Sequence, residues 1–313
     1  MTGDADVRRA LVTGATGYIG SRLARHLLDA GWSVHAVVRP GSDRKRLPGS
    51  VACLVHDQSA AGMARIVADA APDVVFHLAS QAQPHHGIAN LDAMVAANVG
   101  FGAQLLEAMA AAGARRLVEA GTNWEFDAGG HFRPNSFYAA SKHAFRALAD
   151  YYAQRHGFSV TTLLLYDVYG PEDWRGKYLS HLVRALKRNE SMAATPGEQT
   201  IEFVQVDDVA RGFLVAALAR MGPDAGPGLH RYRLDSGRRI TLREATALMA
   251  RLAGRPARVR FGERPYPPQQ IMDPLSVGPR LPGWEPVVSL EHGFRLLLDE
   301  AGIVDATSEV SPP

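Results

Sequence analysis

Cysteine is nearly absent from this chain, which contains only Cys53. A single cysteine excludes an internal disulfide, and nothing else points to secretion. An excess of one charge is also missing, because the formal net charge of +2 is too small to indicate binding to nucleic acid or a membrane surface. No run approaches the ~18 apolar residues of a membrane span, and Met1 to Ala10 lack the apolar region of a signal peptide. We therefore expect a cytoplasmic protein with neither a nucleic-acid nor a membrane partner.

A cluster of metal ligands is lacking as well. His85 and His86 are adjacent, but no cysteine or acidic cluster accompanies them, so we expect no metal site. Apolar residues are plentiful: 46% of the 313 residues are hydrophobic and 21% are charged, as in an ordinary globular protein with ample core. This length allows one large domain or two unequal ones.

Glycine is concentrated in a turn near the start of the chain. Arg9–Thr13 reads as a short buried strand, and apolar residues recur at helical spacing after the turn until Gly31. Between them, Gly14 would allow the tight turn, Gly17 would let the backbone approach phosphates, and Gly20 would let the helix sit close to the sheet. An ordinary turn is the alternative, but the place between strand and helix favours dinucleotide binding. The residues expected to contact the cofactor here are Gly14, Thr16, Gly17, Tyr18, Ile19 and Gly20.

The end of the second predicted strand indicates which dinucleotide binds. Enzymes that select NAD usually carry an acid there, bonded to the ribose 2′-hydroxyl. This chain has Arg39, with the basic loop Arg44–Arg46 shortly after it. A guanidinium can bind the 2′-phosphate of NADP through two parallel hydrogen bonds, whereas a carboxylate would repel it. A solvated surface loop is the alternative for Arg44–Arg46, but for Arg39 we favour NADP, used as NADPH.

Runs typical of buried strands alternate with helical patterns along much of the chain, which predicts an α/β fold with a Rossmann-type doubly wound parallel sheet. We expect residues 1–170 to form an NADP-binding domain, completed by about 201–235. Residues 171–200 and 236–313 would form a smaller C-terminal α/β substrate-binding domain. Late strands are expected at Ile201–Val206 and His230–Leu234, and late helices at Thr241–Ala253 and Leu290–Ala301.

A tyrosine and a lysine lie one helical turn apart in the segment Tyr138–Lys142. Asn135 or Ser136 can cap a helix from about Phe137 to about Arg155, which places both side chains on one face. A free tyrosine has a pKa of ~10 and exchanges protons poorly at neutral pH. A neighbouring ammonium and an oxidised nicotinamide would both lower that pKa. Tyr138 could then protonate a carbonyl oxygen, although a surface Tyr–Lys pair is common in any helix.

Together these motifs resemble the extended short-chain dehydrogenases/reductases, the NAD-dependent epimerase/dehydratase family. The resemblance is closest to nucleotide-hexose 4-ketoreductases of the CDP-abequose synthase type, and it covers nearly the whole chain. Further segments that carry it are His77–Ser80, Asn98–Gly100, Val168–Pro171, Val206–Ala210 and Leu281–Pro286.

The resemblance implies a role for each matching residue. Thr122, Tyr138 and Lys142 would be the catalytic residues, with Thr122 bonded to the substrate carbonyl. Asn98 would organise a water near the lysine, and Asp57 would contact adenine. The remaining implied cofactor contacts are Gln58, Leu78, Ala79, Ser80, Asn98, Tyr138 and Lys142.

Simpler interpretations stay open for several of these positions. Asn98 could bond only backbone within its helix, Thr122 could be an ordinary turn threonine, and Asp57 a loop acid. Asp207 and Asp208 are expected to cap a helix instead of taking part in chemistry.

Departures from the family pattern sharpen the expected function. Dehydratases of the family follow the threonine with Asp-Glu, but here Asn123, Trp124 and Glu125 follow, which speaks against a 4,6-dehydratase. Asn123 and Trp124 would instead contact the substrate. The family asparagine before the VYGP turn is replaced by Asp167.

A basic patch follows that turn. Arg175 and Lys177 could hold the diphosphate of a nucleotide sugar, with a solvated loop as the alternative for Lys177.

These observations predict NADPH-dependent reduction of the 4-keto group of a nucleotide-activated 4-keto-6-deoxyhexose, a dTDP- or CDP-sugar, in deoxysugar biosynthesis. The resemblance also implies a homodimer packed through the helix near Asn98–Ala112 and the helix that carries Tyr138. A nucleotide-sugar epimerase and an NADPH-dependent reductase of a small non-sugar ketone stay open. A non-enzymatic NADP-sensing regulator is a further possibility, against which the retained Tyr138–Lys142 pair speaks.

Overall fold

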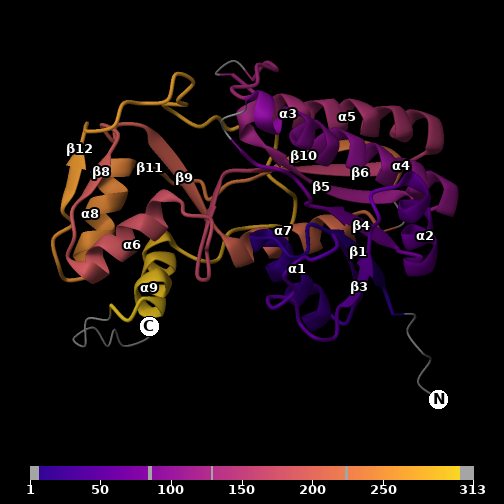
Figure 1. The fold of residues 1–313 in the computed structure, drawn as a ribbon, viewed down its shortest axis with the longest axis horizontal. Coiled ribbons are helices and arrows are strands. Elements are labelled where there is room, and N and C mark those ends of the chain that lie inside the picture. Colours follow the sequence, from indigo (N-terminus) through magenta and orange to yellow (C-terminus); the bar gives the residue numbers. More distant parts are fainter. Residues whose placement is uncertain (1–6, 84–86, 128–129, 223–224, 304–313) are drawn as a thin grey trace. The chain divides into compact units, whose positions relative to one another are not determined.

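A computed structural model describes residues 7–83, 87–127, 130–222 and 225–303 (Figure 1). The chain divides into two compact units. The first unit comprises Met1–Leu165, Val209–Leu234 and Leu275–Trp284, and the second comprises Tyr166–Asp208, Asp235–Pro274 and Glu285–Pro313. Each unit has its own β-structure and its own hydrophobic core.

The first unit is built on a seven-stranded parallel sheet with the order β10-β6-β5-β4-β1-β2-β3. The chain starts at β1, runs outward through β2 and β3, and then returns to the other side of β1 as β4. Parallel strands end at the same edge, so this reversal creates a crevice beyond the carboxyl ends of β1 and β4. The predicted doubly wound parallel sheet is thereby confirmed. The strands are β1 (Arg9–Thr13), β2 (Ser33–Val38), β3 (Ala52–Val55), β4 (Val74–His77), β5 (Arg116–Thr122), β6 (Ser159–Leu165) and β10 (Gly228–Leu234).

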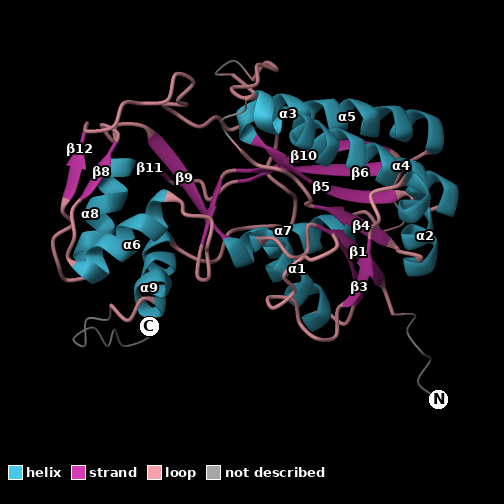
Figure 2. Cartoon of the chain, in the orientation of Figure 1, coloured by secondary structure: helices cyan, strands magenta, loops and turns pink. Residues whose placement is uncertain are grey.

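Helices cover both faces of this sheet, as the cartoons show (Figures 1 and 2). α2 (Ala60–Ala70), α4 (Phe101–Ala112) and α5 (Phe137–His156) pack on one face and share one hydrophobic core with it. α1 (Tyr18–Asp29) and α7 (Val206–Ala219) lie on the other face. This two-sided cover explains why the central strands are largely buried.

One helical stretch is long and apolar enough by composition alone to cross a membrane. It is Ile88–Ala112, which comprises α3 (Ile88–Val95), the π-helix η1 (Ala96–Gly100) and α4. A buried core helix passes the same test, and the Leu105, Leu106 and Met109 side chains of α4 are fully buried in the first core.

Among its described residues, the second unit has two small sheets and the three helices α6, α8 and α9 around a separate core. The rings of Tyr169, Phe203 and Phe294 meet edge to face there, with centroids 5.7–6.0 Å apart. Its sheets are β11-β9-β7 and β12-β8. The elements are β7 (Asp167–Tyr169), α6 (Tyr178–Arg188), β8 (Met192–Ala194), β9 (Thr200–Gln205), β11 (Arg239–Thr241), α8 (Leu242–Leu252), β12 (Val259–Phe261) and α9 (Leu290–Glu300).

The late strands and helices lie within a few residues of their predicted positions, but the units differ from the predicted boundaries. β9 pairs with β7 and β11, so residues 201–205 belong to the second unit and not to the nucleotide-binding sheet. Residues 275–284 return to the first unit. There, the Arg233 N–H donates to Pro279 O (3.0 Å), and the Trp284 indole is buried close to Gly212 of α7.

The packing of α4 on α5 predicts opposite effects of alanine at two neighbouring glycines. A Cβ at Gly102 would lie 2.3 Å from Cδ2 of the buried Phe145, whereas one at Gly100 would come no closer than 3.9 Å to another atom. We expect Gly102→Ala to lower the free energy of unfolding by about 1–3 kcal/mol through overpacking. Gly100→Ala should leave it unchanged or raise it by up to about 1 kcal/mol through helix propensity. Denaturant unfolding of both variants checks this, and equal effects would contradict the packing.

Candidate active site in the first unit

The glycine turn between β1 and α1 brings backbone segments unusually close together. Gly14 has a φ of +69°, and a Cβ there would lie 2.6 Å from both Ala79 N and the Leu78 carbonyl carbon. Gly17 caps α1 without a side chain, and its N–H donates to Gly14 O (2.9 Å). The sequence suggested that Gly20 lets the helix sit close to the sheet. Instead, a Cβ at Gly20 would lie 2.2 Å from Gly14 O, so Gly20 makes room for the turn. The first turn of α1 is left open to an anion.

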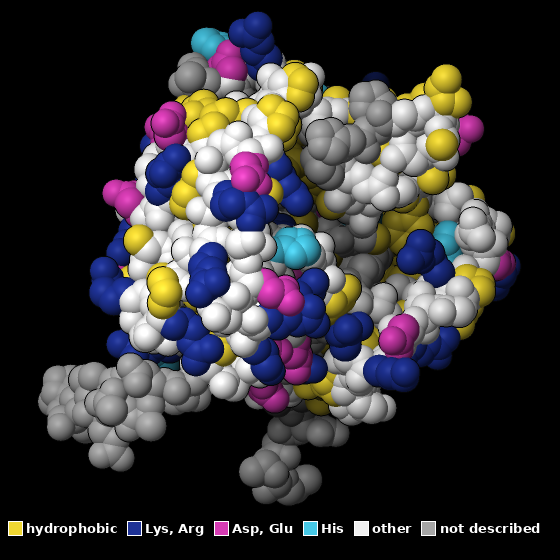
Figure 3. All heavy atoms as spheres, turned by 60° about the vertical axis from the view of Figure 1, so that its left-hand side comes forward, with side chains coloured by type: hydrophobic (Ala, Val, Ile, Leu, Met, Phe, Trp, Pro, Cys, Tyr) yellow, Lys and Arg dark blue, Asp and Glu magenta, His cyan; other side chains and the backbone are white. Residues whose placement is uncertain are grey.

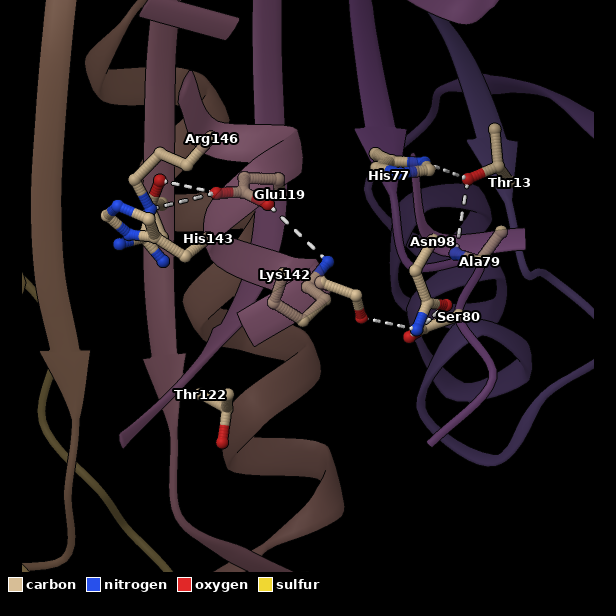
Figure 4. Close-up of polar contacts among 12 residues, drawn as sticks. Thr13, His77, Ala79, Ser80, Asn98, Glu119, Thr122, Lys142, His143 and Arg146 are labelled. Atoms are coloured by element: carbon tan, nitrogen blue, oxygen red, sulfur yellow. Dashed lines mark hydrogen bonds and ion pairs between the residues drawn. The ribbon is translucent and has the colours of Figure 1, made fainter. Parts of the chain in front are cut away.

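The loop after β4 is tied to this turn by Thr13. The Ala79 N–H donates to Thr13 Oγ1 (3.2 Å), and His77 Nδ1 lies 2.8 Å from the same oxygen (Figure 4). His77 is fully buried against the Phe101 and Phe145 rings. Burial, together with the Lys142 ammonium, holds the pKa of His77 well below its usual value, so the imidazole is neutral. Of the predicted contacts, Leu78 and Ala79 lie beside Gly14, and Ser80 follows them in the same loop.

Asn98 links this loop to α5. Its Oδ1 accepts hydrogen bonds from Ser80 Oγ (3.0 Å) and Gln81 N (2.7 Å), and its Nδ2 donates to Ser141 Oγ (2.9 Å). Ser141 Oγ in turn donates to the Tyr138 carbonyl oxygen (2.7 Å). The side chain thus reaches outside its own helix instead of bonding only within it. It lies in the π-helix η1, a distortion frequent at functional sites.

Tyr138 is the second residue of α5 and is half-buried. The Trp124 ring meets its ring edge to face, with centroids 6.3 Å apart. Burial raises the pKa of Tyr138 to about 12; the Glu125 and Glu119 carboxylates add to the rise, and a hydrogen bond with Ser80 opposes it. The chain's own groups therefore keep the phenol protonated, which corrects the expectation that Lys142 lowers its pKa.

The Lys142 side chain points toward the buried carboxylate of Glu119 (Figure 4). Its Nζ lies 3.6 Å from Glu119 Oε2, and the side chains of both residues are almost fully buried, at 2% and 0% exposed. Glu119 Oε1 accepts from Thr162 Oγ1 (2.6 Å) and lies 3.7 Å from Arg146 Nε. The four side chains Lys142, Arg146, Glu119 and Glu125 are referred to below as the buried ion network.

The other half of this network joins α5 to the turn after β5. The Arg146 guanidinium donates to both oxygens of Glu125, at 2.6 and 2.5 Å. Burial raises the pKa of Glu125, and the Arg146 charge opposes that rise. Two cations and two carboxylates balance, as buried charges require. Sequence reasoning missed Glu119, although an acid inside an otherwise apolar strand was a visible signal.

Thr122 ends β5 and is nearly buried. Its Oγ1 accepts from Trp124 N (3.3 Å), and its N–H donates to Glu125 Oε1 (3.3 Å), so it caps the short 3-10 helix η2 (Asn123–Glu125). The expected turn-threonine contacts are therefore present, and the hydroxyl can still donate a proton elsewhere. Asn123 is also buried, and Glu125 is occupied by Arg146, which leaves the dehydratase pattern without its acid.

Arg39 and Asp57 lie beyond the carboxyl ends of β2 and β3. Arg39 is exposed; its N–H donates to Ser42 Oγ (3.1 Å), and its guanidinium has no partner among the described residues. Asp57 is held by local contacts, accepting from Ser59 Oγ (2.7 Å) and pairing with Arg65 (3.0 Å), and the Ser59 hydroxyl lowers its pKa. Gln58, which follows, has a φ of +69°.

The two predicted basic substrate ligands lie in the second unit, each paired with an acid there. Arg175 donates from Nε and Nη2 to the two oxygens of Asp173, both at 2.7 Å, and Nη2 also donates to Val168 O (2.8 Å). Lys177 Nζ lies 3.2 Å from Asp167 Oδ1. Both cations of the expected patch are thus paired with carboxylates, and their role as substrate ligands stays a prediction. Figure 3 shows basic and acidic side chains interspersed on the face that it draws.

No group of three or more His, Cys, Asp or Glu side chains suited to a metal occurs within the part of the chain that the structure describes. His85 and His86 lie outside it.

Comparisons with known proteins agree with this geometry. A CDP-abequose synthase of Yersinia pseudotuberculosis is 29% identical, over 66% of this chain and 72% of its own. A UDP-glucose 4-epimerase of Mycolicibacterium smegmatis is 28% identical, over 91% of this chain and 96% of its own. The solved UDP-glucose 4-epimerase of Thermus thermophilus, in complex with NAD, is similar with a TM-score of 0.80 at 26% identity, covering 94% of this chain and 99% of that one.

The model of the NAD dependent epimerase/dehydratase family matches residues 10–226, which contain the glycine turn, Asn98, Thr122 and the Tyr138–Lys142 pair. The chain therefore belongs to the NAD dependent epimerase/dehydratase family, the extended short-chain dehydrogenases/reductases.

Proposed function

We propose that this protein reduces the 4-keto group of a nucleotide-activated 4-keto-6-deoxyhexose, a dTDP- or CDP-sugar, with NADPH, in deoxysugar biosynthesis. The relatives named for CDP-abequose synthesis and for UDP-glucose epimerisation support a nucleotide sugar as the substrate. The single observation that carries reduction over epimerisation is Arg39 at the end of β2, because its exposed guanidinium favours NADPH, a reductant that exchanges, over an NAD that stays bound through an epimerase cycle.

The residues of the first unit fit a dinucleotide. Gly14 lets the turn lie against the backbone of Leu78 and Ala79, and Gly17 caps α1 without a side chain, so the N-terminus of α1 carries no side-chain cap that would compete with a pyrophosphate. Arg39 would bind a 2′-phosphate, because its guanidinium is exposed and has no partner among the described residues. Ser80 and Asn98 would fix the loop that lies along the cofactor.

The chain's own groups supply the acid and the positioning for the reaction. NADPH, when bound, supplies the hydride that reduces the carbonyl carbon. The Tyr138 hydroxyl gives its proton to the carbonyl oxygen and becomes a phenolate, which solvent later reprotonates. The Thr122 hydroxyl would donate a hydrogen bond to the same oxygen, and Lys142 would bind the nicotinamide ribose. Asn123 and Trp124 would contact the sugar. Arg175 and Lys177, each paired with a carboxylate in the second unit, stay the proposed ligands of the diphosphate.

The direction of proton transfer separates the two candidate functions. An epimerase must first remove a proton from a sugar hydroxyl, which requires a phenolate. A ketone reductase requires a phenol, and burial, which raises the pKa of Tyr138 to about 12 in the cofactor-free protein, favours that form; an epimerase would depend on the oxidised nicotinamide to lower this pKa. Epimerisation stays the second candidate because two of the similar proteins named above are UDP-glucose 4-epimerases.

We also propose a cytoplasmic homodimer. The outward faces of α4 and α5 carry Ala103, Ala144 and Ala147, with Leu148 and Tyr151 beside them, and small residues there would let two helix pairs pack closely.

Turnover tests the function directly. Purified protein should oxidise NADPH with the 4-keto-6-deoxyglucose derivative of dTDP, CDP or GDP, and one base should be preferred. Tyr138→Phe should lower kcat by at least about 10²-fold, because the proton donor is lost. Tyr152→Phe is the matched control: Tyr152 lies on the same helix but bonds Glu107 (2.5 Å), so its variant should keep wild-type turnover.

Two outcomes contradict this proposal. Interconversion of hydroxyl sugars without net NADPH oxidation would establish the epimerase. Tight NADPH binding without turnover of any nucleotide sugar would favour reduction of a small ketone.

The choice of cofactor has its own test. Arg39→Ala should raise KM for NADPH about 10–100-fold, since a charged hydrogen bond to phosphate is lost, and should leave KM for NADH nearly unchanged. Arg44→Ala, in the same exposed loop, is the control and should have little effect on either. Equal loss with both cofactors, or no loss with NADPH, would refute 2′-phosphate binding by Arg39.

A further inference from the structure

Glu119 is the one acidic residue in β5, a strand with a neighbour on each side in the central sheet. Its side chain is 0% exposed. A carboxylate is costly in such a place unless partners compensate its charge. Its position therefore needs an explanation that packing alone does not supply.

The two oxygens of Glu119 have different surroundings. Oε1 accepts the hydrogen bond from Thr162 of β6 (2.6 Å) and lies 3.7 Å from Arg146 Nε. Oε2 has no hydrogen-bond partner among the described residues and lies 3.6 Å from Lys142 Nζ. One carboxylate oxygen is thus anchored to the sheet, and the other is directed at the lysine of the active site (Figure 4).

Charged groups reach Tyr138 from several elements. Glu119 faces it from β5 and Glu125 from η2, and both carboxylates disfavour a phenolate, whereas the Ser80 hydroxyl after β4 favours one. On α5 itself, Lys142 and Arg146 are engaged by these same carboxylates, and the neutral imidazole of His77 adds no charge. Arg231 of β10 and His143 of α5 face the Arg146 and Glu125 end of the network.

We propose that Glu119 is a positioning residue for the proposed ketone reduction, on which this inference rests. It draws the Lys142 ammonium toward β5, 3.6 Å from Oε2, and thereby keeps that cation from stabilising a Tyr138 phenolate. Burial and Glu125 act in the same direction, and the Glu119 charge adds to them. A neutral residue at this position would leave Lys142 free to stabilise the phenolate and would favour the oxidative direction.

A merely structural acid would behave differently from a charge that poises Tyr138. Glu119→Gln keeps the size of the side chain and can still accept from Thr162, but it removes the charge. Glu119→Asp keeps the charge and changes the shape. If charge matters, only the glutamine variant alters Tyr138; if packing matters, the aspartate variant alters it at least as much.

The readout is the pKa of Tyr138 in the cofactor-free protein, followed by NMR of tyrosine labelled with ¹³C at Cζ and assigned with Tyr138→Phe. At pH 11 we expect about one tenth of Tyr138 to be phenolate in the wild type and about one half in Glu119→Gln, because loss of a nearby like charge lowers a pKa by about 1. Glu119→Asp should stay close to the wild type. Glu107→Gln, which removes the carboxylate beside Tyr152, is the matched control and should leave Tyr138 unchanged.

The pH dependence of NADPH oxidation supplies a second readout. The reduction rate should fall at lower pH in Glu119→Gln than in the wild type, because less of its Tyr138 is protonated there, and Glu119→Asp should restore the wild-type profile.

Several results would overturn the inference. Equal shifts in the glutamine and aspartate variants, or none in either, would reduce Glu119 to packing. If Glu119→Gln does not fold, the Tyr138 pKa of the wild type still tests the inference, since a value below 10 would contradict a phenol that keeps its proton. If the Tyr138 pKa is lower in Glu119→Gln than in the wild type, as predicted, but no keto sugar is turned over, the proposed substrate is refuted and the role of Glu119 remains intact.

Discussion

The placement of Tyr138 depends on two ion pairs buried between α5 and the end of β5. Lys142 and Arg146 lie one turn apart on the helix and meet Glu119 and Glu125, so α5 can neither rotate nor slide without leaving a buried charge unpaired. Such a charge costs several kcal/mol, about as much as a large core truncation. From the opposite side, Asn98 fastens the same helix to the loop after β4. The reacting phenol is therefore held by charge as well as by apolar packing.

Short sequence motifs predicted the fold and the main parts of the site. The glycine turn follows a strand and opens a helix, and the positive φ of Gly14 shows the tight turn that its sequence implied. The i and i+4 spacing of Tyr138 and Lys142 needed only a helix, and Ser136 caps that helix as expected. Both motifs are short, so the distant chain has little influence on their geometry. The alternation of strand-like runs with helical patterns along the chain sufficed to predict the parallel sheet.

Features that depend on contacts between residues distant in the chain could not be predicted from the sequence. Lysine at i+4 implied a lowered pKa for Tyr138, but burial raises that pKa, and the Glu125 and Glu119 carboxylates add to the rise. The Lys142 ammonium lies against Glu119, a residue of another element. Strand β9 looked like part of the nucleotide-binding sheet, since nothing in its own residues reveals that its neighbours are β7 and β11. In the sequence Arg175 appeared as a candidate ligand of a diphosphate, but its guanidinium donates two hydrogen bonds to the Asp173 carboxylate. In each case the missing information was the identity of the partner.

The fate of the transferred hydride tests the central claim most directly. The protein would be incubated with NADPH deuterated at C4 of the nicotinamide and with the 4-keto-6-deoxy nucleotide sugar that it turns over. A reductase poised by a protonated Tyr138 leaves one deuterium on C4 of the product sugar for each NADP formed, which NMR and mass spectrometry detect. A product without deuterium, or isomerised sugar with the label still on the cofactor, would contradict net reduction and with it the role assigned to Tyr138.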